Sequence, residues 1–167
     1  YGTKRDCLKG TPQKGNKVVV VGGDNYRIGL GGGSVSSVDT GRYSSGIELN
    51  AVQRANPEMQ KRANNLVRAL CEEDVNPVVS IHDHGSAGHV NCLSELVEEC
   101  GGLIHMDKLP IGDSTLSAKE IIANESQERM GLLIKEDAIE YVRKVAERER
   151  APMYVVGETT GDARFAF

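Results

Sequence analysis

The stretch Ile121-Ile122-Ala123-Asn124-Glu125-Ser126-Gln127-Glu128-Arg129-Met130 joins an apolar helical turn to the apolar run that starts at Met130. It places a carboxylate, a hydroxyl and a carboxamide side by side where a predicted helix is followed by a predicted strand. These groups can donate and accept hydrogen bonds to a polar ligand. We therefore interpret the segment as a recognition site and work outward from it.

A second polar cluster follows the apolar run from Val78 to Ile81. It reads His82-Asp83-His84-Gly85-Ser86-Ala87-Gly88, so Asp83 comes just past a predicted buried strand. Ligands of open α/β sheets bind outside the carboxyl ends of strands. We therefore expect the two polar clusters to face one site.

Length and charge restrict the classes of function. The 167 residues suit one domain with a substantial core. A net charge of −4 without a long Lys/Arg block argues against nucleic-acid binding. No run of about 18 apolar residues is present, so no membrane span is expected.

The cysteines and the chain ends suggest where the protein works. The four cysteines form no CxxC pair and no signal peptide precedes them, which favours reduced thiols in the cytoplasm; they are Cys7, Cys71, Cys92 and Cys100. The chain begins at Tyr1 without a Met and stops at Phe167, within a predicted strand. We expect a piece of a larger protein.

The pattern of apolar residues predicts an α/β (α+β) fold, a mixed sheet with helices packed on it. Residues 1–16 read as a connecting segment and residues 17–167 as a single α/β domain. Four consecutive valines after Lys17 predict a central strand. Asn56 and Pro57 predict the N-cap and first position of an amphipathic helix, and Ser117 with Glu120 predicts a capping box.

Further elements follow from the same patterns. Leu93, Leu96 and Val97 predict a helix that stops at Gly101-Gly102, and Leu103-Ile104 a short edge strand. The last forty residues read strand, helix, strand, strand, which is half of a ferredoxin-like sheet; the segments are 130–134, 138–146, 154–156 and 164–167.

A glycine-rich segment runs from Ile28 to Ser37. Its glycines at 29 and 31–33 would let backbone N–H groups approach an anion, which suits a phosphate site. The GxGxxG spacing fails because Ser34 holds the last position. A tightly bent loop remains the alternative.

Histidines and one aspartate invite a metal interpretation. His82, His84 and His89 suggest a transition-metal site, but no HExxH motif is present and Asp83 would point away from its flanking histidines. Mg²⁺ held by Asp83, water and a substrate phosphate fits better, because Mg²⁺ needs only one or two carboxylates. The alternative is that Asp83 caps the glycine turn that follows it.

Four segments, taken in order, resemble phosphoribosylformylglycinamidine synthase. The likeness starts near the glycine-rich segment and continues through residues 50–59, 81–88, 124–129 and 148–152. The resemblance implies an ATP- and glutamine-dependent ligase of purine biosynthesis, which converts formylglycinamide ribonucleotide to its amidine. It also implies that this chain is the first α/β domain, shared with aminoimidazole ribonucleotide synthase.

The resemblance also implies roles for individual residues. Gln53, Glu125, Ser126 and Gln127 look like substrate-binding residues, and Asp83 looks like a Mg²⁺ ligand. The catalytic residues, most of the ATP site and the glutaminase nucleophile have no counterpart here, so the chain alone is expected to be inactive and its partners to be the other synthetase and glutaminase domains. Ser86 and His89 depart from the residues usual in the family.

Two other functions and one assembly remain open. The chain is alternatively a stand-alone module that binds a phosphate ligand, or a small His-rich metalloprotein. An α/β domain taken from a pseudo-symmetric pair should expose an apolar sheet face, and such patches are reburied by self-association. We therefore expect a homodimer.

Overall fold

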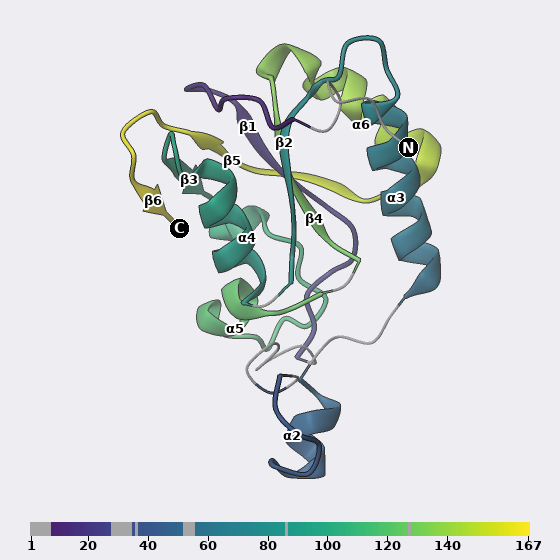
Figure 1. The fold of residues 1–167 in the computed structure, drawn as a ribbon, viewed down its shortest axis with the longest axis vertical. Coiled ribbons are helices and arrows are strands. Elements are labelled where there is room, and N and C mark those ends of the chain that lie inside the picture. The colour runs from purple at the N-terminus through teal and green to yellow at the C-terminus, as the bar shows by residue number, and fades with distance from the viewer. Residues whose placement is uncertain (1–7, 28–34, 36, 52–55, 86, 127) are drawn as a thin grey trace.

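A six-stranded mixed sheet forms the centre of the computed structural model, which describes residues 8–27, 35, 37–51, 56–85, 87–126 and 128–167 (Figure 1). Its order is β2-β4-β1-β5-β3-β6. The strands are β1 (Lys17–Val21), β2 (Val78–Asp83), β3 (Gly102–Ile104), β4 (Met130–Ile134), β5 (Met153–Thr159) and β6 (Phe165–Ala166). The predicted mixed sheet with helices packed on it is confirmed.

Two of the helices begin at the capping residues that the sequence predicts. They are α2 (Ser45–Leu49), α3 (Pro57–Cys71), α4 (Gly88–Val97), α5 (Ala118–Ala123) and α6 (Ile139–Glu149), with 3₁₀ turns η2 (Met106–Lys108) and η3 (Glu136–Ala138). The Asn56 side chain accepts a hydrogen bond from the Met59 N–H at 3.0 Å. Ser117 and Glu120 form the predicted capping box of α5.

The valine strand β1 lies inside the sheet. It pairs antiparallel with both β4 and β5, so these two strands run parallel to each other. Helix α6 connects them across β1, which gives the split β-α-β unit of a ferredoxin-like half. Residues 18–21 are fully buried, as a central strand requires.

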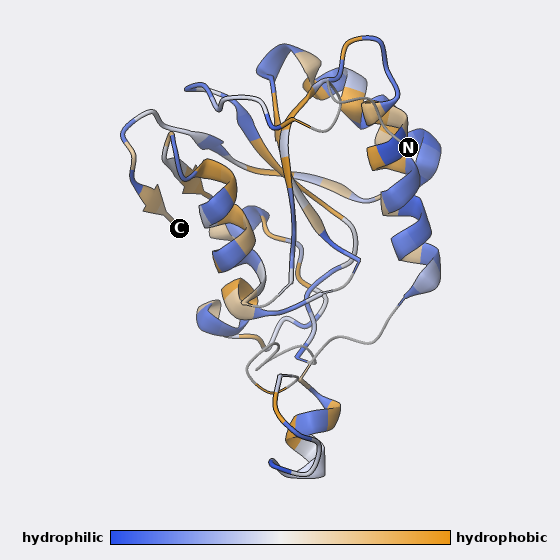
Figure 2. Cartoon of the chain, in the orientation of Figure 1, coloured by the Kyte–Doolittle hydropathy of each residue, from blue (hydrophilic) through white to orange (hydrophobic). Residues whose placement is uncertain are grey.

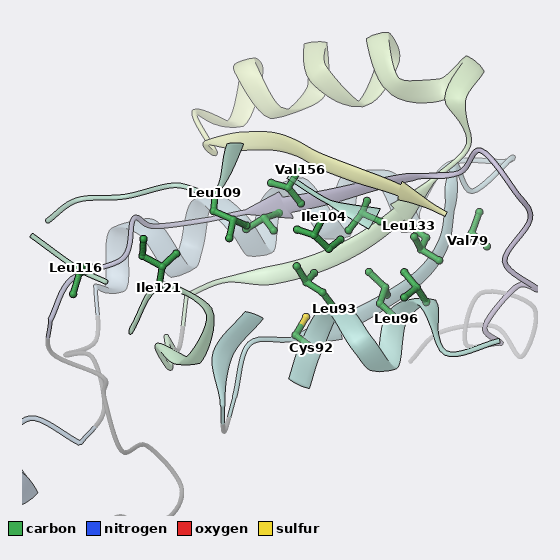
Figure 3. Packing of buried hydrophobic residues seen from close by; sticks show 13 residues of the cluster. Val79, Cys92, Leu93, Leu96, Ile104, Leu109, Leu116, Ile121, Leu133 and Val156 are labelled. Carbon is green, nitrogen blue, oxygen red and sulfur yellow. The ribbon is translucent and has the colours of Figure 1, made fainter. Parts of the chain in front are cut away.

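Helices cover both faces of the central strands. Helices α4 and α5 enclose the core in Figure 3, which contains Leu93, Leu133 and Val156. Helices α3 and α6 enclose a second core, which includes Leu66 and Val142. Figure 2 shows the same division, with apolar strands inside and polar outer faces on the helices. The expectation of an exposed apolar sheet face is therefore wrong for the described residues, because helices pack on both faces of the sheet.

Two predicted boundaries need correction. Asp83 is the last residue of β2 and does not follow it, because it still pairs with Met130. Strand β3 is not at the edge, because the short β6 pairs with it in parallel. Helix α2 falls in a Gly/Ser-rich stretch for which no helix was predicted.

Three observations bear on the expectations about segments and thiols. Within the described part of the chain, no helix is long and apolar enough to cross a membrane. Cys92 and Cys100 are free thiols, while Cys7 lies outside the described residues. In the predicted connecting segment, the Gly10 N–H donates to the Val79 carbonyl at 2.7 Å.

Candidate functional site

The antiparallel pairing of β2 with β4 brings the two polar clusters together. Asp83, at the end of β2, lies opposite Met130, at the start of β4. The Ser126 N–H donates to the His84 carbonyl at 3.2 Å. Asp83, Glu125 and Ser126 therefore share one edge of the sheet, as expected for a single site, whereas Gln53 and Gln127 lie outside the described residues.

Asp83 presents an exposed carboxylate at this edge. Its Oδ1 accepts a hydrogen bond from the Gly85 N–H at 2.9 Å, so the side chain does cap the glycine turn. That cap uses one of the two carboxylate oxygens and leaves the side chain at the surface. A single accessible carboxylate fits a Mg²⁺ ion that keeps several waters.

The histidines do not gather around a common point. His82 Nε2 contacts the Glu95 carboxylate of α4, whereas His84 contacts His89. Among the residues described, no group of three or more His, Cys, Asp or Glu side chains could hold a metal ion. The Asp83 carboxylate is thus the better-placed candidate ligand at this edge.

The loop after β1 forms the third part of the edge. Gly22 has a φ of +111°, and a Cβ at this position would overlap the Glu128 carbonyl. Asn25 is fully buried, and its Nδ2 donates to the Ile121 carbonyl at 3.2 Å. The loop therefore packs directly against the segment that carries the candidate ligand-binding residues.

A buried histidine pair links this loop to β2. His84 Nε2 lies 2.8 Å from His89 Nδ1, and His89 Nε2 lies 3.2 Å from Asn25 Nδ2. Because the amide nitrogen donates, His89 Nε2 accepts and its Nδ1 carries the proton that is donated to His84. Burial lowers the pKa of both imidazoles well below the ordinary value, and each also lies near Arg129. Both rings are therefore neutral at pH 7.

Arg129 closes the loop that carries the candidate triplet. Its guanidinium is fully buried, and Nη2 donates to the Asn124 carbonyl at 2.6 Å and to Asn124 Oδ1 at 3.1 Å. In the described part of the chain its Nε and Nη1 have no hydrogen-bond partner. Burial lowers the Arg129 pKa to about 10.

Ser126 lies inside this closed loop. Its side chain is buried, and within the described residues its Oγ makes no hydrogen bond. The sequence marked Ser126 but not Arg129 or the His84–His89 pair as parts of one network. The spacing of Arg129, His84 and His89 in the sequence gives no sign that they are buried. Only the unusual density of polar residues beside apolar runs could have indicated their role.

The chain is similar to a known family and to known enzymes. The family described as AIR synthase related protein, C-terminal domain, matches residues 13–167. Phosphoribosylformylglycinamidine synthase of Dictyostelium discoideum is 44% identical over 163 residues, 95% of this chain and 12% of that protein. The enzyme of the same name from Homo sapiens is 42% identical over 158 residues, 93% of this chain and 12% of that protein.

A solved structure of Thermotoga maritima PurL complexed with FGAR has the same fold. It superposes with a TM-score of 0.84 at 23% identity, over 98% of this chain and 27% of that one. The present chain thus spans about an eighth of the length of the curated relatives it matches.

Proposed function

The chain belongs to the family of AIR synthase related protein C-terminal domains, and we propose that it serves as an α/β domain of a phosphoribosylformylglycinamidine synthase. In this role it helps to bind formylglycinamide ribonucleotide and Mg²⁺. The observation that carries the proposal is the pairing of β2 with β4, which brings Asp83 beside Glu125 and Ser126.

Each polar group at the edge receives a role that fits its chemistry. Glu125 and Ser126, with Gln53 and Gln127 outside the described residues, bind the hydroxyl and amide groups of the ribonucleotide by hydrogen bonds. Asp83 holds Mg²⁺, which when bound offsets the charge of a phosphate group. The buried Arg129 holds the loop from Asn124 to Arg129 by a hydrogen bond, and the buried His84–His89 pair holds the loop after β2.

Turnover requires groups that other domains supply. The one fully buried thiol in the described part of the chain, Cys92, has its pKa raised to about 12 by burial, so it is a thiol and not a thiolate at neutral pH. We assign most of the ATP site and the glutaminase to the remaining domains of the synthase, since the chain spans only 12% of the relatives that carry this name. The chain alone is expected to show no turnover with formylglycinamide ribonucleotide, ATP, Mg²⁺ and ammonia.

Kinetics separate the roles of the two clusters. In a full-length synthase that carries this chain as its matching segment, Asp83→Asn should reduce kcat and raise the Mg²⁺ requirement, because the charge acts on a reacting phosphoryl group. Gln127→Ala should raise KM for the ribonucleotide, with a loss of about 1–3 kcal/mol. Asp74→Asn is the matched control. Asp74 is exposed and precedes β2, so it lies toward the opposite end of that strand from Asp83.

Two results would count against the proposal. One is an Asp83→Asn variant whose kcat and Mg²⁺ dependence equal those of the Asp74→Asn control. The other is turnover that copurifies with the isolated chain and is lost in Asp83→Asn.

A further inference from the structure

A cavity of about 160 Å³ lies between α3 and the start of β4, next to the loop closed by Arg129. Its position places it beside the candidate site but on the α3 side of the sheet. The lining residues are Gln60, Ala63, Asn64, Val67, Glu128 and Met130.

Glu128 is the single charged residue among those that line the cavity. Its side chain is only 8% exposed, and its Oε2 is buried without a hydrogen-bond partner in the described part of the chain. A buried carboxylate oxygen that lacks a donor is unfavourable, because it has lost its hydration without compensation. Among the described residues, Glu128 Oε2 is therefore an acceptor without a donor.

The loop after β1 lies against one side of the Glu128 carboxylate. A Cβ at Gly23 would lie 3.1 Å from Glu128 Oε1, so the loop after β1 packs directly against the carboxylate. The neighbouring Arg129 attracts the Glu128 carboxylate, but the hydrogen bonds of its guanidinium go to Asn124. A ligand with N–H groups would supply the donor to Oε2 that the described residues lack.

The other lining groups restrict the ligand class. The walls combine apolar side chains, Ala63, Val67 and Met130, with the carboxamides of Gln60 and Asn64, which can accept further N–H groups. We propose that this cavity binds a small planar N–H cation of the amidinium class, with Glu128 as its counter-ion.

The consequence for turnover rests on the proposed function. That reaction converts a neutral carboxamide into an amidine, which is a base that carries positive charge when protonated. A carboxylate beside the substrate loop stabilises the charged group more than the neutral one, which shifts the equilibrium between bound substrate and bound product toward the product. Glu128 would then distinguish the amide of the substrate from the amidine of the product.

The test compares two small probes of nearly the same shape on the chain itself. Acetamidinium chloride and acetamide are titrated separately at constant ionic strength, and the amide NMR signals of Ala63, Val67 and Met130 are followed. We expect saturable shifts with acetamidinium, and at least about tenfold weaker binding of acetamide, the factor that 1.4 kcal/mol produces. Glu128→Gln should abolish the preference, whereas Glu147→Gln, an exposed control on α6, should keep it.

Equal affinity for the two probes would overturn the proposal, as would acetamidinium shifts that persist in Glu128→Gln. If Glu128→Gln does not fold, the comparison of the two probes on the unchanged chain still decides. The test contains no ribonucleotide, so its failure is distinct from failure of the proposed function. If the cavity prefers acetamidinium but Asp83 proves irrelevant to turnover, the amidinium site is supported and the proposed function is not.

Discussion

Arg129 carries a positive charge in the interior, where the nearby carboxylates of Glu128 and Asp24 favour that charge. Burying a charge in this way is costly, and its benefit here is the closure of the loop from Asn124 to Arg129 by one planar group. Lysine would keep the buried charge but could not reproduce the two-acceptor geometry of Nη2. The loop shape is thus tied to the guanidinium itself.

We therefore predict that Arg129→Lys lowers the free energy of unfolding by roughly 2–4 kcal/mol, measured by urea denaturation. Arg143→Lys is the control, because Arg143 makes only an exposed ion pair with Glu140 and should change stability by less than about 0.5 kcal/mol. Equal effects of the two substitutions would show that Arg129 does not hold the loop.

The buried histidines make stability depend on pH. Burial lowers the pKa of His84 and of His89 in the folded state, so the unfolded chain takes up protons near its ordinary pKa of about 6.5 while the folded chain does not. Stability is therefore complete above pH 6.5 and is lost as the pH falls below it.

We expect the unfolding free energy to fall by up to about 2.7 kcal/mol per pH unit between pH 6 and 5, the value for two protons. His89→Gln should halve this slope, as measured by denaturant unfolding at several pH values. A slope that is unchanged in the variant would assign the pH dependence to other groups.

At the scale of elements, the site depends on a close approach between the start of α4 and the loop after α5. Gly88 has a φ of +55°, and a Cβ there would overlap the Asn124 carbonyl. Gly41 has a φ of +94° and no atom within 4 Å of the corresponding position. Both glycines have a positive φ, but only at Gly88 would an added Cβ meet another atom of the protein.

Gly88→Ala should therefore cost at least about 2 kcal/mol more than Gly41→Ala, which bears only the left-handed strain of about 1–2 kcal/mol. Thermal and urea unfolding of both variants measure the difference. Similar losses in the two would mean that the contact with Asn124 relaxes easily.

Local signals in the sequence predicted the elements but not their partners. The valines after Lys17, the Asn56-Pro57 start and the Ser117 capping box act within a few residues, and each was confirmed. The order of the strands depends on packing between distant segments. For that reason β3 was wrongly placed at the edge, and the stretch of α2 was not predicted as a helix.

The candidate site was predicted in the same partial way. Asp83 can meet the segment 125–127 if the strands beside the two clusters are antiparallel neighbours. The pairing of β2 with β4 meets that condition. The support beneath the site was missed, since burial of His84, His89 and Arg129 depends on the tertiary fold. A polar residue in sequence looks the same whether it is buried or solvated.

At the scale of the whole molecule, self-association needs a surface other than the sheet. Helix α2 projects from the body and has no buried residue, and the apolar side chains of Tyr43, Ile47 and Leu49 on and before it are exposed (Figures 1 and 2). We keep the prediction of a homodimer and place its contact at α2.

Sedimentation at high micromolar concentration tests this assembly. The unchanged chain should sediment as a dimer, and Ile47→Ser with Leu49→Ser should convert it to a monomer. As a control, Val75→Ser alters an exposed apolar residue far along the chain from α2 and should leave the dimer intact. A monomeric unchanged chain would contradict the prediction.

In the proposed function, the end of β2 and the start of β4 form one site for metal and substrate. Mn²⁺ in place of Mg²⁺ tests it directly, because the bound paramagnetic ion broadens nearby amide NMR signals. Titrated into the chain with formylglycinamide ribonucleotide, Mn²⁺ should broaden the signals of Asp83, Gly85, Glu125 and Ser126 together, and Asp83→Asn should abolish all four effects. Broadening that spares residues 125 and 126, or that persists in Asp83→Asn, would contradict the account.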